Sequence, residues 1–394
     1  MTVTQLPSSE APRHASAATY QMCTACIMDT TDPEIAFDDR GVCNHCREFG
    51  RLQELFSGGP EDRAARLGRK IDEIKAAGRG KDYDCLIGLS GGVDSSYSAY
   101  LVSQFGLRAL AVHLDNGWNS ELAVKNVENI VKRLKFDLHT HVLDWEQFRD
   151  LQLSFLYAST SDAEIPTDHA IGAILLRTAA KFRIPYLVSG TNVATEGILP
   201  SSWTYGVWDW RYIAGVHRRF GRRSLAGFPH YSLYDYGYYI GVRRIQSVRF
   251  LDLVDYDKAA AMRTIEDALA WRYYGGKHYE SIYTKFFQGY ILPRKFSIDK
   301  RRAHLSTLIC SGQVDRDAAL AEMERPPYPR EDQEADRTYV VKKLGITQHE
   351  FDRIMALPVR TYRDYPNSEA LRRRVVRIAG VAKRLRLIPQ RNSL

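Results

Sequence analysis

The chain has 394 residues, and 55 Lys and Arg against 47 Asp and Glu give it a formal charge of +8. Its 44% hydrophobic and 26% charged residues exclude a wholly disordered, a collagenous and a disulfide-scaffold protein. We expect a cytoplasmic protein, because no apolar run approaches the ~18 residues of a membrane-spanning helix and the first 22 residues lack the apolar core of a secretory signal.

The N-terminal part contains most of the cysteines. Residues 1–20 are polar and rich in small residues, which predicts a disordered leader. Residues 21–50 carry a C-x2-C-x16-C-x2-C array made of Cys23, Cys26, Cys43 and Cys46. Two such pairs, separated by the hairpin-like run IAFDDRGV, can place four thiolates at the corners of a tetrahedron, which predicts a zinc ribbon with a structural Zn²⁺. A disulfide interpretation is weaker in a reduced cytosol. His45, inside the second pair, is interpreted as a bystander.

A repeating strand and helix pattern follows a charged helical connector over residues 51–80. Within 81–200, the expected strands are 83–89, 108–114, 138–143 and 185–189, and helices are expected over 97–106, 120–135, up to about 158, and over 168–183. This alternation predicts an α/β fold with a parallel sheet flanked by helices on both faces. Ligands of such sheets bind at the carboxyl ends of the strands.

A glycine-rich turn, SGGVDSS, lies between the first expected strand and its helix. It consists of Ser90, Gly91, Gly92, Val93, Asp94, Ser95 and Ser96. Glycines let the backbone approach an anion, while serine hydroxyls and first-turn amides can point at it. The turn lacks the lysine of a Walker A loop. Because Asp94 would repel phosphate, we expect it to hold Mg²⁺ or to anchor the loop's amides. The plainer alternative is a tight turn capped by Asp94 or Ser95.

These residues resemble a known family. SGGVDSS after a hydrophobic strand looks like the PP-loop of the N-type ATP pyrophosphatases, which include asparagine, GMP and NAD synthetases. HLDNGW (113–118) is similar to that family's element beside the adenosine, and SGTNVATE (189–196) to its element near the triphosphate and magnesium. The resemblance implies an adenine nucleotide alpha-hydrolase-like PP-loop domain that binds ATP and Mg²⁺. It implies nucleotide contacts through Asp115, Asn116, Gly190, Thr191 and Glu196.

Two further parts of the chain resemble a more specific family. The cysteine module and the stretch 271–313 resemble the N-acetyl sugar amidotransferases of surface-polysaccharide (lipopolysaccharide) biosynthesis, and residues 351–367 extend the likeness. That resemblance implies an enzyme that adenylates the N-acetyl amide oxygen of a sugar. It also implies that a glutaminase partner supplies ammonia and that the product carries an acetamidino group. The two spare cysteines, Cys85 in an expected strand and Cys310, offer no context for a built-in glutaminase.

Basic side chains near residue 300 are candidates for contacting the pyrophosphate. Related synthetases use a C-terminal lysine or arginine there, and the candidates are Arg294, Lys295, Lys300, Arg301 and Arg302. Lys295 and Lys300, with Asp94 and Ser95, form our predicted catalytic set. The alternative is a solvated basic helix face.

The C-terminal half is expected to be mainly helical. Residues 201–330 form an aromatic-rich and helical region for substrate or partner, and 13 of the chain's 44 aromatic residues fall within 201–250. These rings could stack on sugar faces, although a second core or an interface is the favoured interpretation. A C-terminal helical segment, residues 331–394, ends in a basic tail.

The net charge belongs to that tail. Residues 371–394 hold eight Lys or Arg and no acid, so the remaining residues carry 47 charges of each sign. Apolar residues recur at helical spacing, which predicts an amphipathic basic helix; they are Leu371, Val375, Ile378, Ala379, Ala382 and Leu385. It could contact an acidic partner, an anionic membrane surface or the protein's own body. The neutral body argues against nucleic-acid binding.

Three alternatives remain open at this point. One is a PP-loop tRNA-modifying enzyme of the thiolase type with a structural zinc, although such enzymes need further cysteines near ATP. Another is a zinc-ribbon scaffold with a degenerate ATP site. The third is an amidotransferase acting on a base or an antibiotic instead of a sugar.

Overall fold

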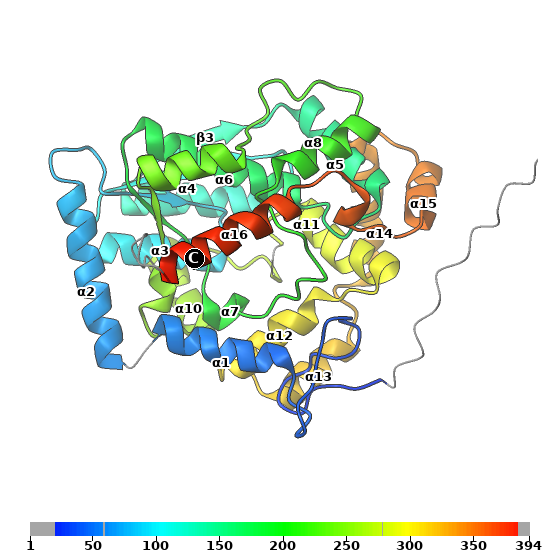
Figure 1. The fold of residues 1–394 in the computed structure, drawn as a ribbon, viewed down its shortest axis with the longest axis horizontal. Helices are drawn as coiled ribbons and strands as arrows, with labels where there is room; N and C mark the ends of the chain where they lie inside the picture. Colours follow the sequence, from blue (N-terminus) through cyan, green and yellow to red (C-terminus); the bar gives the residue numbers. More distant parts are fainter. Residues whose placement is uncertain (1–19, 58–59, 278, 385–394) are drawn as a thin grey trace, which may run out of the picture.

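The computed structural model describes residues 20–57, 60–277 and 279–384, so the predicted leader and the end of the basic tail lie outside the described residues. A five-stranded sheet organises the fold (Figure 1). Its strands are β1 (Cys85–Gly88), β2 (Ala109–Asp115), β3 (Asp137–Val142), β4 (Tyr186–Val188) and β5 (Gln246–Val248). They pair in the order β3-β2-β1-β4-β5, and all neighbours are parallel.

The first four strands confirm the predicted ones, and the parallel α/β fold is confirmed with them. β5 was not predicted. It contains three residues, Gln246–Val248, and its pairing with Tyr186–Val188 of β4 comes from a distant part of the chain. A run this short carries no periodic signal of its own, because strand patterning needs at least four residues to be visible.

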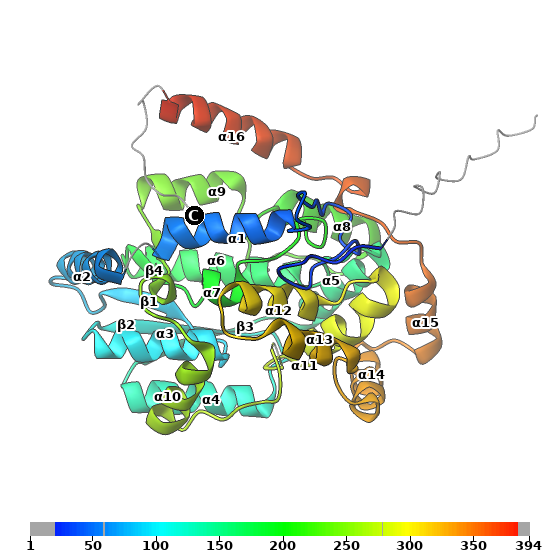
Figure 2. The same cartoon turned by 90° about the horizontal axis from the view of Figure 1, so that it is seen from below.

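Helices cover both faces of the sheet (Figure 2). One face packs against α3 (Val93–Gln104), α4 (Glu121–Leu134) and α10 (Lys258–Leu269), and the other against α6 (Ile165–Lys181). Because successive strand residues point to opposite faces, Ile87 joins the first core and Leu86 the second. Both side chains are fully buried, which explains the continuous apolar runs of these strands.

The strand order reverses at β1. The chain moves from β1 to β2 on one side, while β4 pairs with β1 on the other side, in register Leu86 to Leu187. In open parallel sheets the crevice outside such a reversal is where ligands bind. The fold therefore places the turns after β1 and β4 side by side.

The remaining elements surround this core. They are α1 (Asn44–Ser57), α2 (Pro60–Ala77), α5 (Trp145–Ala158), α7 (Val193–Glu196), α8 (Trp210–Phe220), α9 (Leu233–Gly237), η1 (Tyr238–Val242), η2 (Phe250–Asp252), α11 (Ile282–Phe286), η3 (Phe287–Phe296), α12 (Lys300–Cys310), α13 (Arg316–Glu324), α14 (Arg330–Leu344), α15 (Gln348–Ala356), η4 (Tyr362–Asp364) and α16 (Glu369–Arg384). The mainly helical C-terminal region is thus confirmed. Over the described residues, no helix is both long enough and apolar enough to cross a membrane.

Most rings of the aromatic-rich stretch form a core. Trp203, Tyr212 and Phe228 are buried, and their cluster also includes Phe155 of α5 and Phe286 of α11. This supports the core interpretation over sugar stacking for these rings.

His169 of α6 illustrates how tightly this region is held. Its Nδ1–H donates to the carbonyl oxygen of Val207 at 2.6 Å, and its Nε2 accepts from the backbone N–H of Tyr231 at 3.2 Å. The ring stacks on Tyr231, with centroids 4.4 Å apart. Burial lowers the pKa of His169 to about 4. A proton on Nε2 would face the Tyr231 N–H.

This pKa predicts a pH-dependent loss of stability. The unfolded chain binds the proton near pH ~6.5 and the folded chain only near pH 4, so stability falls as the pH drops through this window. Between about pH 7.5 and pH 5, urea unfolding should show a loss of about 2 kcal/mol that His169→Gln lacks. The exposed His349→Gln serves as the control and should keep the loss. Equal pH dependence in the His169 variant would contradict the assignment.

Candidate functional site

A cavity of about 960 Å³ lies at the carboxyl edge of the sheet. Its walls come from the turns after β1, β2 and β4, from the segment between Tyr273 and Gly289, and from the first turns of α12. The volume is at the upper end of the ~300–1,000 Å³ usual for small-molecule sites. The cavity therefore has room for a nucleotide together with a second substrate.

The glycine turn meets this cavity at Ser90, and the predicted residues Gly91 to Ser96 are absent from the lining. Gly91 has φ +83°, and a Cβ there would lie 2.7 Å from the carbonyl oxygen of Ala123, so only glycine fits. The hydroxyls of Ser90 and Ser95 lie 3.1 Å apart, and Ser96 Oγ donates to the Gly92 carbonyl at 2.7 Å. α3 begins at Val93, inside this segment. Its N-terminal amides give the turn the geometry of an anion site.

The predicted cap alternative for the turn is not supported. Gly92 is the N-cap of α3, and no side chain caps the helix there. Asp94 instead accepts a hydrogen bond from the Tyr256 hydroxyl. Burial, and secondly the carboxylate of Glu196, raise the pKa of Asp94. Two neighbouring carboxylates are hard oxygen ligands of the kind that Mg²⁺ prefers.

The turn after β4 packs against the glycine turn. A Cβ on Gly190 would lie 2.8 Å from the backbone nitrogen of Ser95, so the two turns touch. Thr191 and Glu196 line the cavity, and Glu196 lies 3.4 Å from the ammonium group of Lys277. The predicted grouping of Gly190, Thr191 and Glu196 with the glycine turn is therefore what the structure displays.

The turn after β2 contributes one of its two predicted residues to the lining. Asn116 lines the cavity, and its side-chain oxygen accepts from the Trp118 backbone N–H at 3.0 Å. Asp115 accepts from the Gly117 N–H at 2.8 Å and shapes the turn. Asp115 is absent from the lining.

The predicted lysines fall in different places. Lys300 lines the cavity and forms an ion pair with Glu164 at 3.0 Å. Lys295 is absent from the lining, because its ammonium group donates to the carbonyls of Ile354, Met355 and Leu357 at the end of α15. Burial lowers the pKa of Lys295 to about 8. The structure therefore does not bring Lys295 to the other predicted catalytic residues.

Two lysines that the sequence analysis did not single out lie closer to the glycine turn. Lys258 and Lys277 both line the cavity, and both are near enough to Asp94 to act on its pKa. Burial lowers the pKa of Lys258. A sequence signal existed for Lys277, which follows the pair Gly275-Gly276. Lys258 has no such signal, because α10 is brought here only by packing on α3.

Glu164, at the start of α6, was also missed. Its Oε2 accepts from Lys300 Nζ at 3.0 Å and from Gln288 Nε2 at 2.9 Å, and all three residues line the cavity. These donors come from α12 and η3, more than a hundred residues along the chain. The part of the cavity beyond the glycine turn is therefore polar and balanced in charge.

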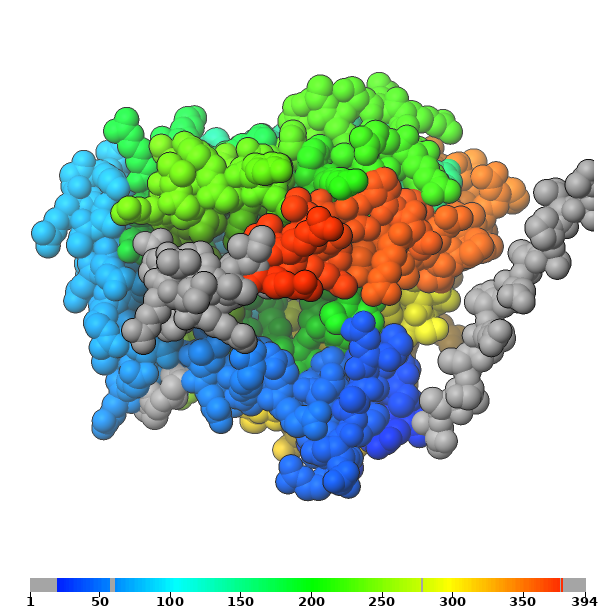
Figure 3. All heavy atoms as spheres, in the orientation of Figure 1, coloured from blue at the N-terminus to red at the C-terminus, as the bar shows by residue number. Residues whose placement is uncertain are grey.

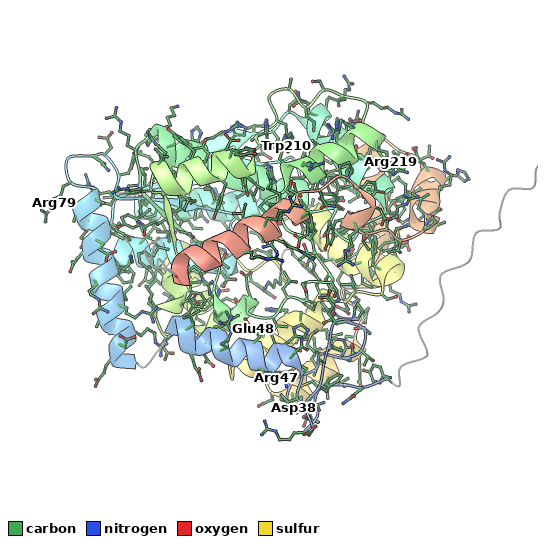
Figure 4. The ribbon with its side chains drawn as sticks, in the orientation of Figure 1. Asp38, Arg47, Glu48, Arg79, Trp210 and Arg219 are labelled. Carbon is green, nitrogen blue, oxygen red and sulfur yellow. The ribbon has the colours of Figure 1, made fainter. Side chains whose placement is uncertain are left out.

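The four predicted cysteines form a second site. Their sulfur atoms all lie within 4.8 Å of one another, and the nearest pairs are 3.6–3.8 Å apart. Thiolates at about 2.3 Å from a tetrahedral Zn²⁺ would be ~3.8 Å apart, so the cluster fits zinc. The hairpin between the pairs is closed by Asp38, which accepts from the Val42 N–H at 2.9 Å and lies 3.9 Å from Arg47 (Figure 4).

His45 is a bystander, as predicted. Its Nε2 lies 2.7 Å from Asp32, which also accepts from the Ser202 hydroxyl at 2.7 Å. Cys310 was expected to lack context, but its sulfur lies 3.6 Å from that of Cys46. This fifth thiol comes from the last residue of α12.

α12 joins the two sites. The backbone N–H of Ile27 donates to Ser306 Oγ at 3.2 Å, and Arg302 pairs with Asp29 at 3.0 Å. The same helix presents Lys300 and His304 to the cavity. The cysteine module is thereby a support for one wall of the cavity.

Family comparisons match two segments of the chain. Residues 280–379 match the family described as LPS biosynthesis protein WbpG-like, C-terminal domain, and residues 80–165 match the family described as Thiamine biosynthesis protein (ThiI). The predicted resemblance to surface-polysaccharide proteins with a PP-loop domain is confirmed over these segments. No curated protein shows significant similarity to the chain.

Several solved structures are similar in part. NMN synthetase from Francisella tularensis is 17% identical with a TM-score of 0.26, over 34% of this chain and 56% of that one. A predicted subunit of tRNA methyltransferase from Methanocaldococcus jannaschii is 17% identical with a TM-score of 0.27, over 46% and 74%. NH3-dependent NAD synthetase from Campylobacter jejuni is 14% identical with a TM-score of 0.26, over 54% and 87%. This chain spans little more than half of the first, and TM-scores this low carry no argument about function.

The cysteine cluster predicts about one zinc ion per chain. Cys43→Ser should lose the metal and lower the melting temperature, because a three-thiolate site binds zinc far more weakly. Cys310→Ser is the matched control and should keep the zinc, since Cys310 is outside the group of four. Elemental analysis and thermal unfolding measure both. Metal-free protein that melts at an unchanged temperature would contradict the assignment.

Proposed function

We propose that this chain, whose segments resemble a PP-loop synthetase and an LPS biosynthesis protein, is the synthetase subunit of an ATP-dependent amidotransferase. It adenylates the N-acetyl amide oxygen of a sugar and uses ammonia to form an acetamidino group, releasing AMP and pyrophosphate. One observation carries this proposal. The two matched segments line the same cavity, with Ser90 and Asn116 from one and Gln288 and Lys300 from the other.

The proposed chemistry has two steps. The amide oxygen attacks the α-phosphorus of ATP, an O–P bond forms, and the bond to pyrophosphate breaks. Ammonia then adds to the imidate carbon, the C–O bond to AMP breaks, and the nitrogen loses a proton to leave the amidine. Steps of this kind depend on positioning and on neutralising the charge that develops on the phosphate oxygens.

Residues of the cavity and of the adjoining glycine turn suit these needs. Ser90, Ser95 and the amides at the start of α3 would hold the pyrophosphate. Asp94 and Glu196 would hold Mg²⁺, which supplies charge neutralisation when bound. Lys258 and Lys277 would add positive charge, and Lys300 with Glu164 would face the acceptor.

We propose a separate glutaminase as the source of ammonia. A built-in glutaminase needs a reactive cysteine close to a histidine. Among the described residues that line the cavity there is no cysteine. Cys85 is buried in β1, where burial raises the pKa of its thiol to about 12, and Cys310 lies against Cys46. The same observations disfavour a thiolase-type tRNA-modifying enzyme, which needs a sulfur-carrying cysteine near ATP.

The assignment of cations predicts different outcomes for two lysines. Lys277→Met should weaken Mg-ATP binding at least about tenfold, because it removes a positive charge beside the glycine turn. Lys295→Met should leave Mg-ATP binding unchanged and lower the melting temperature, because Lys295 holds the end of α15. Isothermal titration with Mg-ATP measures the first effect. Equal ATP affinity in both variants would contradict the assignment.

The proposed reaction predicts strict dependence on ammonia. The purified chain, given ATP and a panel of UDP-linked N-acetyl sugars, should release pyrophosphate and AMP with ammonium salts and not with glutamine alone. Mass spectrometry of the sugar should show oxygen replaced by NH, and Ser95→Ala should lower the rate. Turnover with glutamine in the absence of a second protein would contradict the separate glutaminase, and co-purifying tRNA would favour the rival enzyme.

A further inference from the structure

α16 (Glu369–Arg384) leaves its first turns uncovered. Every side chain from Ala370 to Val375 is exposed, and so is Arg377. Leu371 and Val375, one turn apart on the same side of the helix, are 42% and 54% exposed. Over the described residues, the protein's own body therefore covers Leu371 and Val375 only in part; contact with that body was one of the three predicted roles of the basic tail.

The start of the helix is nevertheless fixed. The backbone N–H of Ser368 donates to Asp209 at 2.6 Å, and the Arg372 guanidinium lies 5.4 Å from the centre of the Trp208 ring. Arg372 and Arg373 also pair with Glu369 at 3.3 and 2.7 Å. The helix is thus held at its start, while Leu371, Arg374 and Val375 remain exposed.

A second exposed apolar segment lies on the same side of the molecule. Tyr234 of α9 is 83% exposed, and Tyr238 and Val242 of η1 are 49% and 69% exposed. Figure 2 places α9 and α16 along the same edge of the molecule, and Figure 3 shows both segments on one face. The tyrosines and Val242 lie beside Arg243 and Arg244, which are exposed as well, so this segment also combines exposed large side chains with basic ones.

The charge of this face points to an anionic surface. α16 contains six Lys or Arg and one Glu, and residues 371–394 contain eight Lys or Arg and no acid. A second copy of the same helix would oppose like charges, which disfavours self-association through it. Arginines flanking an apolar row, with tyrosines nearby, are the composition of helices that lie in the interface of anionic bilayers.

We propose that α16, together with the tyrosines of α9 and η1, docks this protein on an anionic membrane surface. Leu371 and Val375 enter the headgroup boundary, and the arginines contact lipid phosphates. This docking is independent of the proposed reaction, because none of these residues lines the cavity. No described helix, α16 included, is long and apolar enough to cross a membrane. An amphipathic basic helix binds a bilayer by lying in its interface.

Vesicle flotation of the full chain tests the proposal. The protein should float with phosphatidylcholine vesicles containing about one-third phosphatidylglycerol and not with phosphatidylcholine alone. Salt at about 0.5 M should release it. Arg374→Glu with Arg377→Glu should lower the bound fraction at least about tenfold. Leu371→Ser with Val375→Ser should do the same at low salt, because insertion requires the apolar row.

The matched control is Arg69→Glu with Arg79→Glu, which changes the net charge equally in and beside α2 rather than in α16. Arg79 lies at the edge of the molecule in Figure 4. The control variant should bind anionic vesicles as the wild type does. Circular dichroism and Mg-ATP binding, which should not change, verify that all variants fold.

Several results would overturn the proposal. The wild-type protein could fail to bind anionic vesicles, the α16 variants could bind as the wild type does, or the control variant could lose binding. A dimer in solution that Leu371→Ser with Val375→Ser dissociates, without vesicle binding, would assign the face to a second copy instead. Binding that follows charge alone would also overturn it, because the apolar row would then have no role.

Discussion

Parallel pairing of β1 with both β2 and β4 is the constraint on which the candidate site depends. Because parallel strands end at the same edge, the glycine turn after β1 and the Gly190 turn after β4 are forced together. Contact between them is close enough to require glycine at Gly190, while Gly91 is required by its positive φ and by the nearby Ala123 carbonyl. The helix that follows β1 then begins at the reversal of strand order, three residues after Ser90, which lines the cavity. The site is therefore a consequence of topology before any side chain takes part.

α12 extends this arrangement to a part of the chain that is distant in sequence. Its first residue, Lys300, reaches the cavity, and its last residue, Cys310, touches the cysteine cluster. Between them, Ser306 and Arg302 hold the backbone and side chains of residues 27–29. A metal at the cluster would act on catalysis only by fixing this helix, because four thiolates leave no position for a substrate. The cysteine cluster and the cavity therefore belong to one packed unit.

Charged side chains in the cavity lie next to opposite charges, whereas α16, an exposed helix, carries an excess of basic side chains. In the cavity, lysines face carboxylates, as Lys277 faces Glu196 and Lys300 faces Glu164, which limits the cost of removing them from water. The basic stretch PRKFSIDKRR is mostly occupied by structural contacts. Arg294 donates to Gln333, Arg301 pairs with Asp299, and Arg302 pairs with Asp29. In the first two turns of α16, Arg372 and Arg373 pair with the single carboxylate of Glu369, so basic groups outnumber acidic ones there.

The sequence by itself determined the elements whose signal is local. Apolar runs predicted β1 to β4, the spacing of four cysteines predicted their cluster, and SGGVDSS predicted a turn at a strand end, because each depends on neighbours within a few residues. Tertiary structure alone decided what depends on distant residues: the pairing of β5, the approach of Lys258 and Glu164 to the cavity, and the meeting of Cys310 with Cys46. Lys295 and Lys300 show the difference most plainly. They are five residues apart, yet one holds the end of α15 and the other reaches the cavity, because η3 ends and α12 begins between them.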